Sequence, residues 1–78
     1  MWIRSQDKKI LSDVNEVLML PMDENKCIIS GFWDKGSDTL GIYSSEEKAL
    51  KVLDAIEHDL ESPYDYVFQM PQDDEVGL

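Results

Sequence analysis

The chain has 78 residues, of which 7 are Lys or Arg and 17 are Asp or Glu, so its formal net charge is −10. This length allows one domain and excludes a multidomain enzyme. The negative charge argues against direct binding to nucleic-acid phosphates, which requires the opposite sign. Hydrophobic residues make up 42% of the chain, enough to form a core, so the composition differs from that of a disordered acidic tail.

The first half of the chain predicts strands joined by tight turns. Residues 1–3 and 9–11 flank a polar turn at 5–8, a pattern typical of a hairpin. Residues 14–20 alternate as a strand does and end at Pro21, and residues 26–33 are rich in β-branched and aromatic side chains. We expect these two segments to pair antiparallel, and residues 39–43 to form a further strand after the loop at 34–38.

The segment that follows predicts a helix over about residues 45–61. In Ser44-Ser45-Glu46-Glu47, a Ser at the N-cap with a Glu three residues later has the pattern of a capping box. Pro63 should end the helix, because the residue before a proline avoids helical geometry. The residues that recur on one stripe and should pack on a sheet are Ala49, Val52, Leu53, Ile56 and Leu60.

The alternation of Tyr64, Tyr66, Phe68 and Met70 predicts a last strand over about residues 65–70. We expect residues 1–71 to form a single α+β domain, in which hairpins build a mostly antiparallel, curled sheet and the helix packs on one face. Residues 72–78 are acidic and are expected to be a frayed tail.

The central strands are apolar on both faces. We expect Val17, Met19, Ile28 and Phe32 to point away from the face that carries Leu18, Leu20, Cys27 and Ile29. Either the sheet curls toward a half-barrel or a partner covers the second face, because large exposed apolar patches are rare on monomers. We therefore expect this face to bind another protein or a second copy of the chain in a homodimer.

Catalytic and metal-binding patterns are weak. Cys27 lies in an apolar strand, where a thiol behaves as a small buried hydrophobe, and His58 lies on the wet side of the helix, so a catalytic pair is not expected. One Cys and one His are too few for a structural zinc site. Asp34 and Asp38 lack the spacing of a calcium loop, and the glycines match no phosphate-binding loop. We expect a protein that is not an enzyme and has no metal or cofactor.

The excess charge gathers in the second half of the chain, where no Lys or Arg follows Lys51. This charge can serve solubility, or it can form a docking face for a basic protein. In the second case the acids on the outer helix face imitate a row of phosphates and block a nucleic-acid groove, and these acids are Glu47, Asp54, Glu57 and Glu61.

Trp2, Trp33 and Tyr43 can anchor an interface, although in a domain of this size a place in the core is the stronger expectation. No apolar run approaches the roughly 18 residues that span a bilayer. The single cysteine and the lack of a secretory signal in the sequence favour a cytoplasmic protein.

Three blocks of sequence resemble small uncharacterised proteins of phages and mobile elements in Gram-positive bacteria. The blocks are MWIRSQDKK at residues 1–9, LGIYSSEEKAL at 40–50 with VLDAI at 52–56, and VFQMP at 67–71. The resemblance implies a small domain in the host-cell cytoplasm that acts as an accessory or host-takeover factor, including an inhibitor of a host defence enzyme such as a nuclease. Because those proteins have no assigned activity, the resemblance supplies no catalytic residues.

Overall fold

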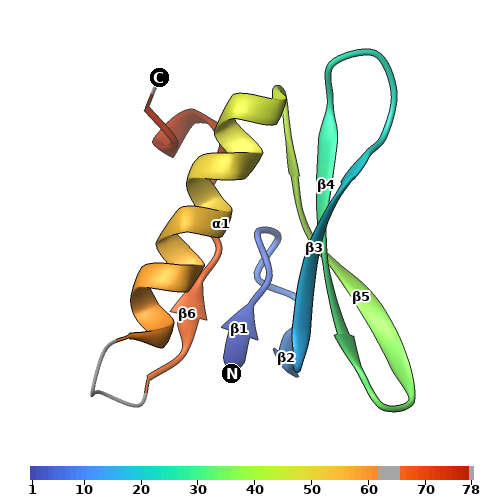
Figure 1. Ribbon diagram of the computed structural model, residues 1–78, viewed down its shortest axis with the longest axis vertical. Helices are drawn as coiled ribbons and strands as arrows, with labels where there is room; N and C mark the ends of the chain where they lie inside the picture. Colours follow the sequence, from blue (N-terminus) through green and yellow to red (C-terminus); the bar gives the residue numbers. More distant parts are fainter. Residues whose placement is uncertain (62–65, 78) are drawn as a thin grey trace.

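The computed structural model describes residues 1–61 and 66–77, which form an α+β fold (Figure 1). The small sheet has the order β2–β1–β6 and contains β1 (Trp2–Arg4), β2 (Leu11–Asp13) and β6 (Phe68–Gln69). The large sheet has the order β3–β4–β5 and contains β3 (Glu16–Pro21), β4 (Cys27–Trp33) and β5 (Gly36–Tyr43). The predicted fold class is confirmed, and among the described strands β1 and β6 form the one parallel pair.

The N-terminal hairpin forms as predicted, with β1 antiparallel to β2 and Ile3 opposite Ser12. Its turn is held by side chains. The Ser5 hydroxyl donates to the Asp7 carboxylate (2.6 Å) and accepts from the backbone N–H of Ile10 (3.1 Å). The Ser5 hydrogen bond and a second one from the Lys9 N–H lower the pKa of the Asp7 carboxyl.

The large sheet is an antiparallel meander. The loop predicted at 34–38 is shorter than expected, because β5 begins at Gly36 and only Asp34 and Lys35 separate it from β4. A β-bulge lies between Ile29 and Ser30, which pair with Gly41 and Thr39, so Leu40 has no partner residue on β4. A bulge changes which side of a strand the next residue faces.

The predicted assignment of side chains to the two faces of β3 is wrong. Val17 and Met19 are half-buried and pack against the core, whereas Leu18 and Leu20 are 37% and 42% exposed. The register places Met19 opposite Ile29, whose side chain is fully buried. Val17 and Met19 therefore lie on the inner face of the large sheet.

Helix α1 (Glu46–Leu60) packs across the inner face of the large sheet, where it contacts all three strands. Its N-cap is Ser45, whose side chain accepts from the N–H of Lys48 at 3.2 Å. The predicted capping box does not form, because the residue three positions after this cap is Lys48 and has no carboxylate. Ala49, Val52 and Ile56 are buried as predicted, Leu53 is half-buried, and Leu60 is 65% exposed. Pro63 lies outside the described residues.

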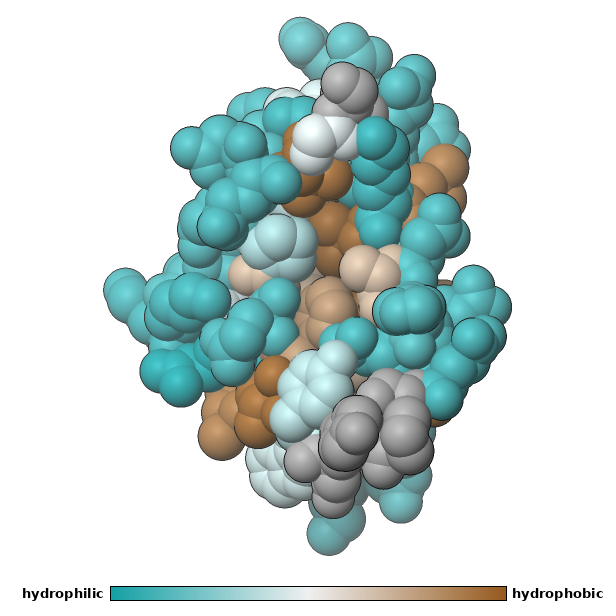
Figure 2. Space-filling model, turned by 90° about the vertical axis from the view of Figure 1, so that its left-hand side faces the viewer, coloured by the Kyte–Doolittle hydropathy of each residue, from teal (hydrophilic) through white to brown (hydrophobic). Residues whose placement is uncertain are grey.

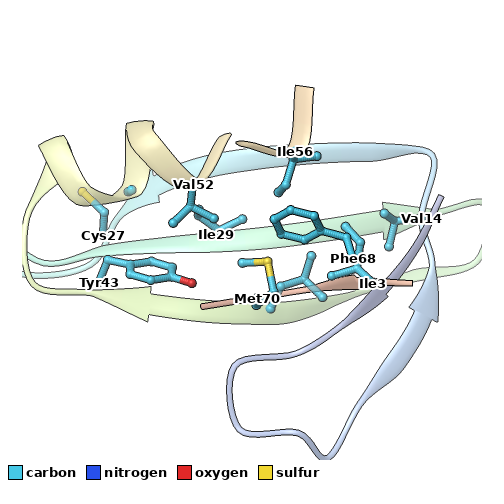
Figure 3. Packing of buried hydrophobic residues seen from close by; sticks show 11 residues of the cluster. Ile3, Val14, Cys27, Ile29, Tyr43, Val52, Ile56, Phe68 and Met70 are labelled. Carbon is cyan, nitrogen blue, oxygen red and sulfur yellow. The ribbon is translucent and has the colours of Figure 1, made fainter. Parts of the chain in front are cut away.

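The core lies between the helix, the inner face of the large sheet and the small sheet (Figure 3). Phe68 and Met70 extend into it from the segment around β6, and Ile29 and Tyr43 do so from the large sheet. The Tyr43 hydroxyl donates to the carbonyl of Pro71 at 2.8 Å. Burial raises the pKa of Tyr43 well above its usual range, and the nearby acids of the C-terminal segment add to the shift.

Strand β6 is shorter than the predicted strand at 65–70. Phe68 and Met70 are buried as the alternation requires, whereas Tyr66 is exposed and its hydroxyl donates to the Asp59 carboxylate at 2.6 Å. Tyr64 and Asp65 lie outside the described residues. In the parts of the chain that the structure describes, no helix is long and apolar enough to cross a membrane.

Residues 72–77, for which the sequence predicts a frayed tail, contact the rest of the domain in the structure. The short helix η1 (Asp73–Glu75) lies here, and the Asp73 carboxylate accepts from the N–H of Ser44 at 2.8 Å. This hydrogen bond and the ammonium of Lys48, 3.5 Å away, lower the pKa of the Asp73 carboxyl. Val76 packs against the core, and Lys51 donates to the Gly77 carbonyl. The segment is therefore part of the domain.

Candidate protein-interaction surfaces

The outer face of the large sheet carries an apolar surface that we call the outer patch. The register aligns Leu20, Ile28 and Ile42 in one row across the three strands. Leu20 and Ile42 are both 42% exposed. The outer patch consists of Leu18, Leu20, Ile28, Phe32 and Ile42. None of these residues belongs to the hydrophobic core that the described residues form.

The outer patch has few charges. The register places Leu18, Ser30 and Thr39 in a second row, and Glu16, Phe32 and Ser37 in a third. Glu16 is the one ionisable residue in the three rows. A partner that covers this face therefore buries apolar side chains with little desolvation of charge.

The structure divides the apolar interface predicted from the sequence. Ile28 and Phe32 share the outer face, whereas Val17 and Met19 belong to the inner face. Sequence reasoning did not assign Ile42 to a face, and in the structure Ile42 pairs with Ile28 on the outer face and is 42% exposed. On β3, the outer face therefore carries Leu18 and Leu20 instead of Val17 and Met19.

The outer side of α1 carries the acidic residues predicted from the sequence, and we call them the acidic stripe. All four are exposed, and their spacings of seven, three and four residues place them on one side of a helix. The ion pairs found among the described residues join the α-amino group to Asp13 and Lys48 to Asp73, so they leave the acidic stripe unpaired. The stripe consists of Glu47, Asp54, Glu57 and Glu61.

A groove of about 590 Å³ lies between the second half of α1 and the start of β3, and we call it the helix groove. Its lining is mostly apolar and comes from Met1, Val14, Val17, Leu53, Ile56 and Leu60. Asp54 and Glu57, two members of the acidic stripe, also line it. Acidic and apolar groups therefore meet at this one concave site.

The three aromatic residues considered as anchors have different surroundings. Tyr43 is fully buried and Trp33 is half-buried against the core, as the core interpretation predicted. Trp2 is 47% exposed on the small sheet. None of the three lines the helix groove.

Residues with catalytic or metal-binding potential are dispersed. Cys27 is buried at the start of β4, and His58 is exposed near the end of α1. Asp34 accepts from the Asn15 amide (3.4 Å), and Asp38 accepts from the Ser12 hydroxyl (3.0 Å), so each has a separate partner. Within residues 1–61 and 66–77, no three His, Cys, Asp or Glu side chains form a group that could hold a metal ion.

Comparison with protein-family models, with curated proteins and with solved structures gave no match to this chain.

Proposed function

We propose that this protein is a non-enzymatic, acidic protein-interaction module that binds another protein through the outer patch. The observation that carries the proposal is the row of Leu20, Ile28 and Ile42, which lies on the opposite side of the large sheet from the core. Full burial of such a side chain contributes about 1.5–3 kcal/mol, so covering the exposed 42% of Leu20 or of Ile42 contributes about 1 kcal/mol. Several side chains together support an interface.

A second copy of the chain is one partner that fits the outer patch. Two copies that each carry a net charge of −10 repel one another, and salt screens this repulsion. A homodimer formed through the patch should therefore strengthen as ionic strength rises. Sedimentation equilibrium in low and high salt measures this, and a 9.0 kDa species at all accessible concentrations would end the homodimer proposal.

The cellular setting that we propose is the cytoplasm of a bacterium that carries a phage or mobile element. The sequence resemblance of residues 1–9, 40–56 and 67–71 supports this setting. In it the protein acts as an accessory factor on a protein of the host. The single free cysteine, buried in β4, is compatible with a reducing compartment.

Two aspartate variants test the outer patch. Ile42→Asp places a charge in the patch, and Leu50→Asp is the matched control, because Leu50 has a similar exposure (44%) but lies on α1. We expect Ile42→Asp to abolish capture of a partner from host lysate and Leu50→Asp to retain it. Equal capture by both variants, with circular dichroism showing both folded, would contradict the proposal.

The acidic stripe supports a second function, inhibition of a basic host protein by imitation of nucleic-acid phosphates. Its four carboxylates are exposed along one side of α1 and lie outside the ion pairs found in residues 1–61 and 66–77. The triple variant Asp54→Lys/Glu57→Lys/Glu61→Lys should then abolish capture, and affinity in the wild type should fall steeply with salt. Capture that survives this charge reversal but is lost in Ile42→Asp would favour the outer patch over imitation.

A further inference from the structure

The helix groove is separate from the outer patch, because Val17, which lines the groove, is on the inner face of the large sheet. Its volume of about 590 Å³ is in the range of pockets that bind ligands. Val14 and Ile56 are nearly fully buried and form its base. Leu60 is 65% exposed at the end of α1, so a large apolar area is accessible to a partner.

The charged side chains that line the helix groove have one sign. Asp54 and Glu57 are exposed at its helix side and lie outside the ion pairs found among the described residues. The positive group beside it is the α-amino group of Met1, which already pairs with the Asp13 carboxylate at 3.0 Å. Figure 2 shows the side of the molecule on which α1 lies, where a strip of hydrophobic residues runs between hydrophilic surfaces.

We propose that the helix groove binds a basic amphipathic segment of a partner protein. An apolar side chain of that segment enters the groove between Val17 and Leu53, and a neighbouring Lys or Arg reaches Asp54 and Glu57. Binding of an amphipathic helix in an apolar groove is a common mode of peptide recognition. The site is additional to the outer patch and does not depend on it.

A second copy of this chain does not have the chemistry of the occupant. The chain is strongly acidic, so a second copy presents mostly carboxylates to the acidic side of the groove. The two lysines of α1 are already engaged, Lys48 with Asp73 and Lys51 with the Gly77 carbonyl. Charge complementarity therefore selects a basic partner.

Titration of the ¹⁵N-labelled full chain with three designed peptides tests the proposal. The first peptide is an amphipathic helix of Leu and Lys, the second replaces each Leu with Ser, and the third replaces each Lys with Glu. We expect the Leu/Lys peptide to shift the amide resonances of Val17, Leu53 and Glu57. The other two should bind at least about tenfold more weakly, because each lacks one of the two required features.

Two double variants that each remove two negative charges show whether peptide binding depends on the acids at the groove or on total charge. Asp54→Asn/Glu57→Gln should weaken binding of the Leu/Lys peptide by about tenfold. Glu46→Gln/Asp74→Asn, which removes two exposed acids that belong neither to the groove nor to the acidic stripe, should change it by less than about twofold. Equal weakening by both double variants would overturn the proposal, because binding would then follow total charge.

Leu60→Ser tests the apolar part of the helix groove. Because Leu60 is 65% exposed, the variant should fold normally, and it should weaken peptide binding by about fivefold. Peptide-induced shifts confined to the outer patch, or equal affinity for the Ser/Lys peptide, would refute the groove site. If these tests fail while Ile42→Asp still abolishes partner capture, the proposed function stands and the groove proposal is wrong.

Discussion

Gly31 in β4 is expected to resist substitution because of a close approach to Val14. A β-carbon added at Gly31 would lie 2.7 Å from Val14 Cγ1 and 2.9 Å from Leu40 Cδ1. The leucine methyl can rotate away, but Val14 is β-branched, so its methyl groups are fixed close to the backbone. The backbone of Gly31 has no positive φ, so the obstacle to Ala is steric. Overpacking of this kind costs about 2 kcal/mol of unfolding free energy.

The same contact predicts that a second substitution compensates for the first. Val14 is 3% exposed, and Val14→Ala alone should cost about 2–3 kcal/mol by removing two buried methyl groups and leaving a cavity. In Gly31→Ala/Val14→Ala, the new methyl group occupies the space that Val14 Cγ1 has left. The double variant should therefore cost about 2–3 kcal/mol instead of the sum, a coupling energy of about 2 kcal/mol.

Urea unfolding followed by tryptophan fluorescence measures these free energies, and unchanged m-values would show that the comparison is valid. Gly77→Ala is the control, because nothing lies within 4 Å of a β-carbon placed there. It should change stability by less than about 0.5 kcal/mol and should not couple to Val14→Ala. If the losses of unfolding free energy in Gly31→Ala and Val14→Ala add up to the loss in the double variant within about 0.5 kcal/mol, the reasoning is refuted.

Two further predictions concern the start of α1. Ser45→Ala should lower the unfolding free energy by about 1 kcal/mol, because the N-cap hydrogen bond is lost. Ser44→Ala is the control and should lower it by less than half as much. Equal losses of unfolding free energy in urea would contradict the assignment of Ser45 as the cap. Asp73→Asn should cost about 1 kcal/mol at neutral pH, because the carboxylate that accepts from Ser44 is lost. Since the folded-state pKa of Asp73 lies below the unfolded value of about 3.9, this stabilisation is present above about pH 4 and disappears as the pH falls through the folded pKa. A difference between wild type and Asp73→Asn that stays constant from pH 7 to pH 2 would show that the carboxylate is not its source.

The helix and the hairpins could be predicted from the sequence because local signals determine them. Ser45 and the spacing of Ala49, Val52 and Ile56 mark one helix with one buried side. The inner face of β3 could not be predicted, because residues 17–20 are all apolar and both faces of the strand therefore carry side chains suited to a core. A shift of one position exchanges the two sides of a strand, so Val17 and Met19 were predicted on the face that in the structure carries Leu18 and Leu20.

The helix groove and the docked C-terminal segment could not be predicted for a different reason. The groove brings together Met1, Val17 and Leu53, which are far apart in the sequence. The acidic composition of residues 72–78 is typical of a solvated tail, and no sequence pattern shows that Asp73 meets Ser44 and Lys48. Such contacts depend on the arrangement of the whole chain and have no local signature.

The parallel pairing of β1 with β6 has a consequence for the order in which the molecule is built. Because Ile3 pairs with Phe68, the small sheet is complete only after the segment that contains β6 has been synthesised. The β3–β4–β5 meander depends only on neighbouring segments and can form earlier. Until β6 arrives, the inner side of that meander lacks Phe68 and Met70, so a nascent chain exposes apolar surface on both sides of the large sheet. Pairing of β6 with β1 is therefore the step that brings Phe68 and Met70 onto the inner side of the large sheet and leaves the outer patch exposed.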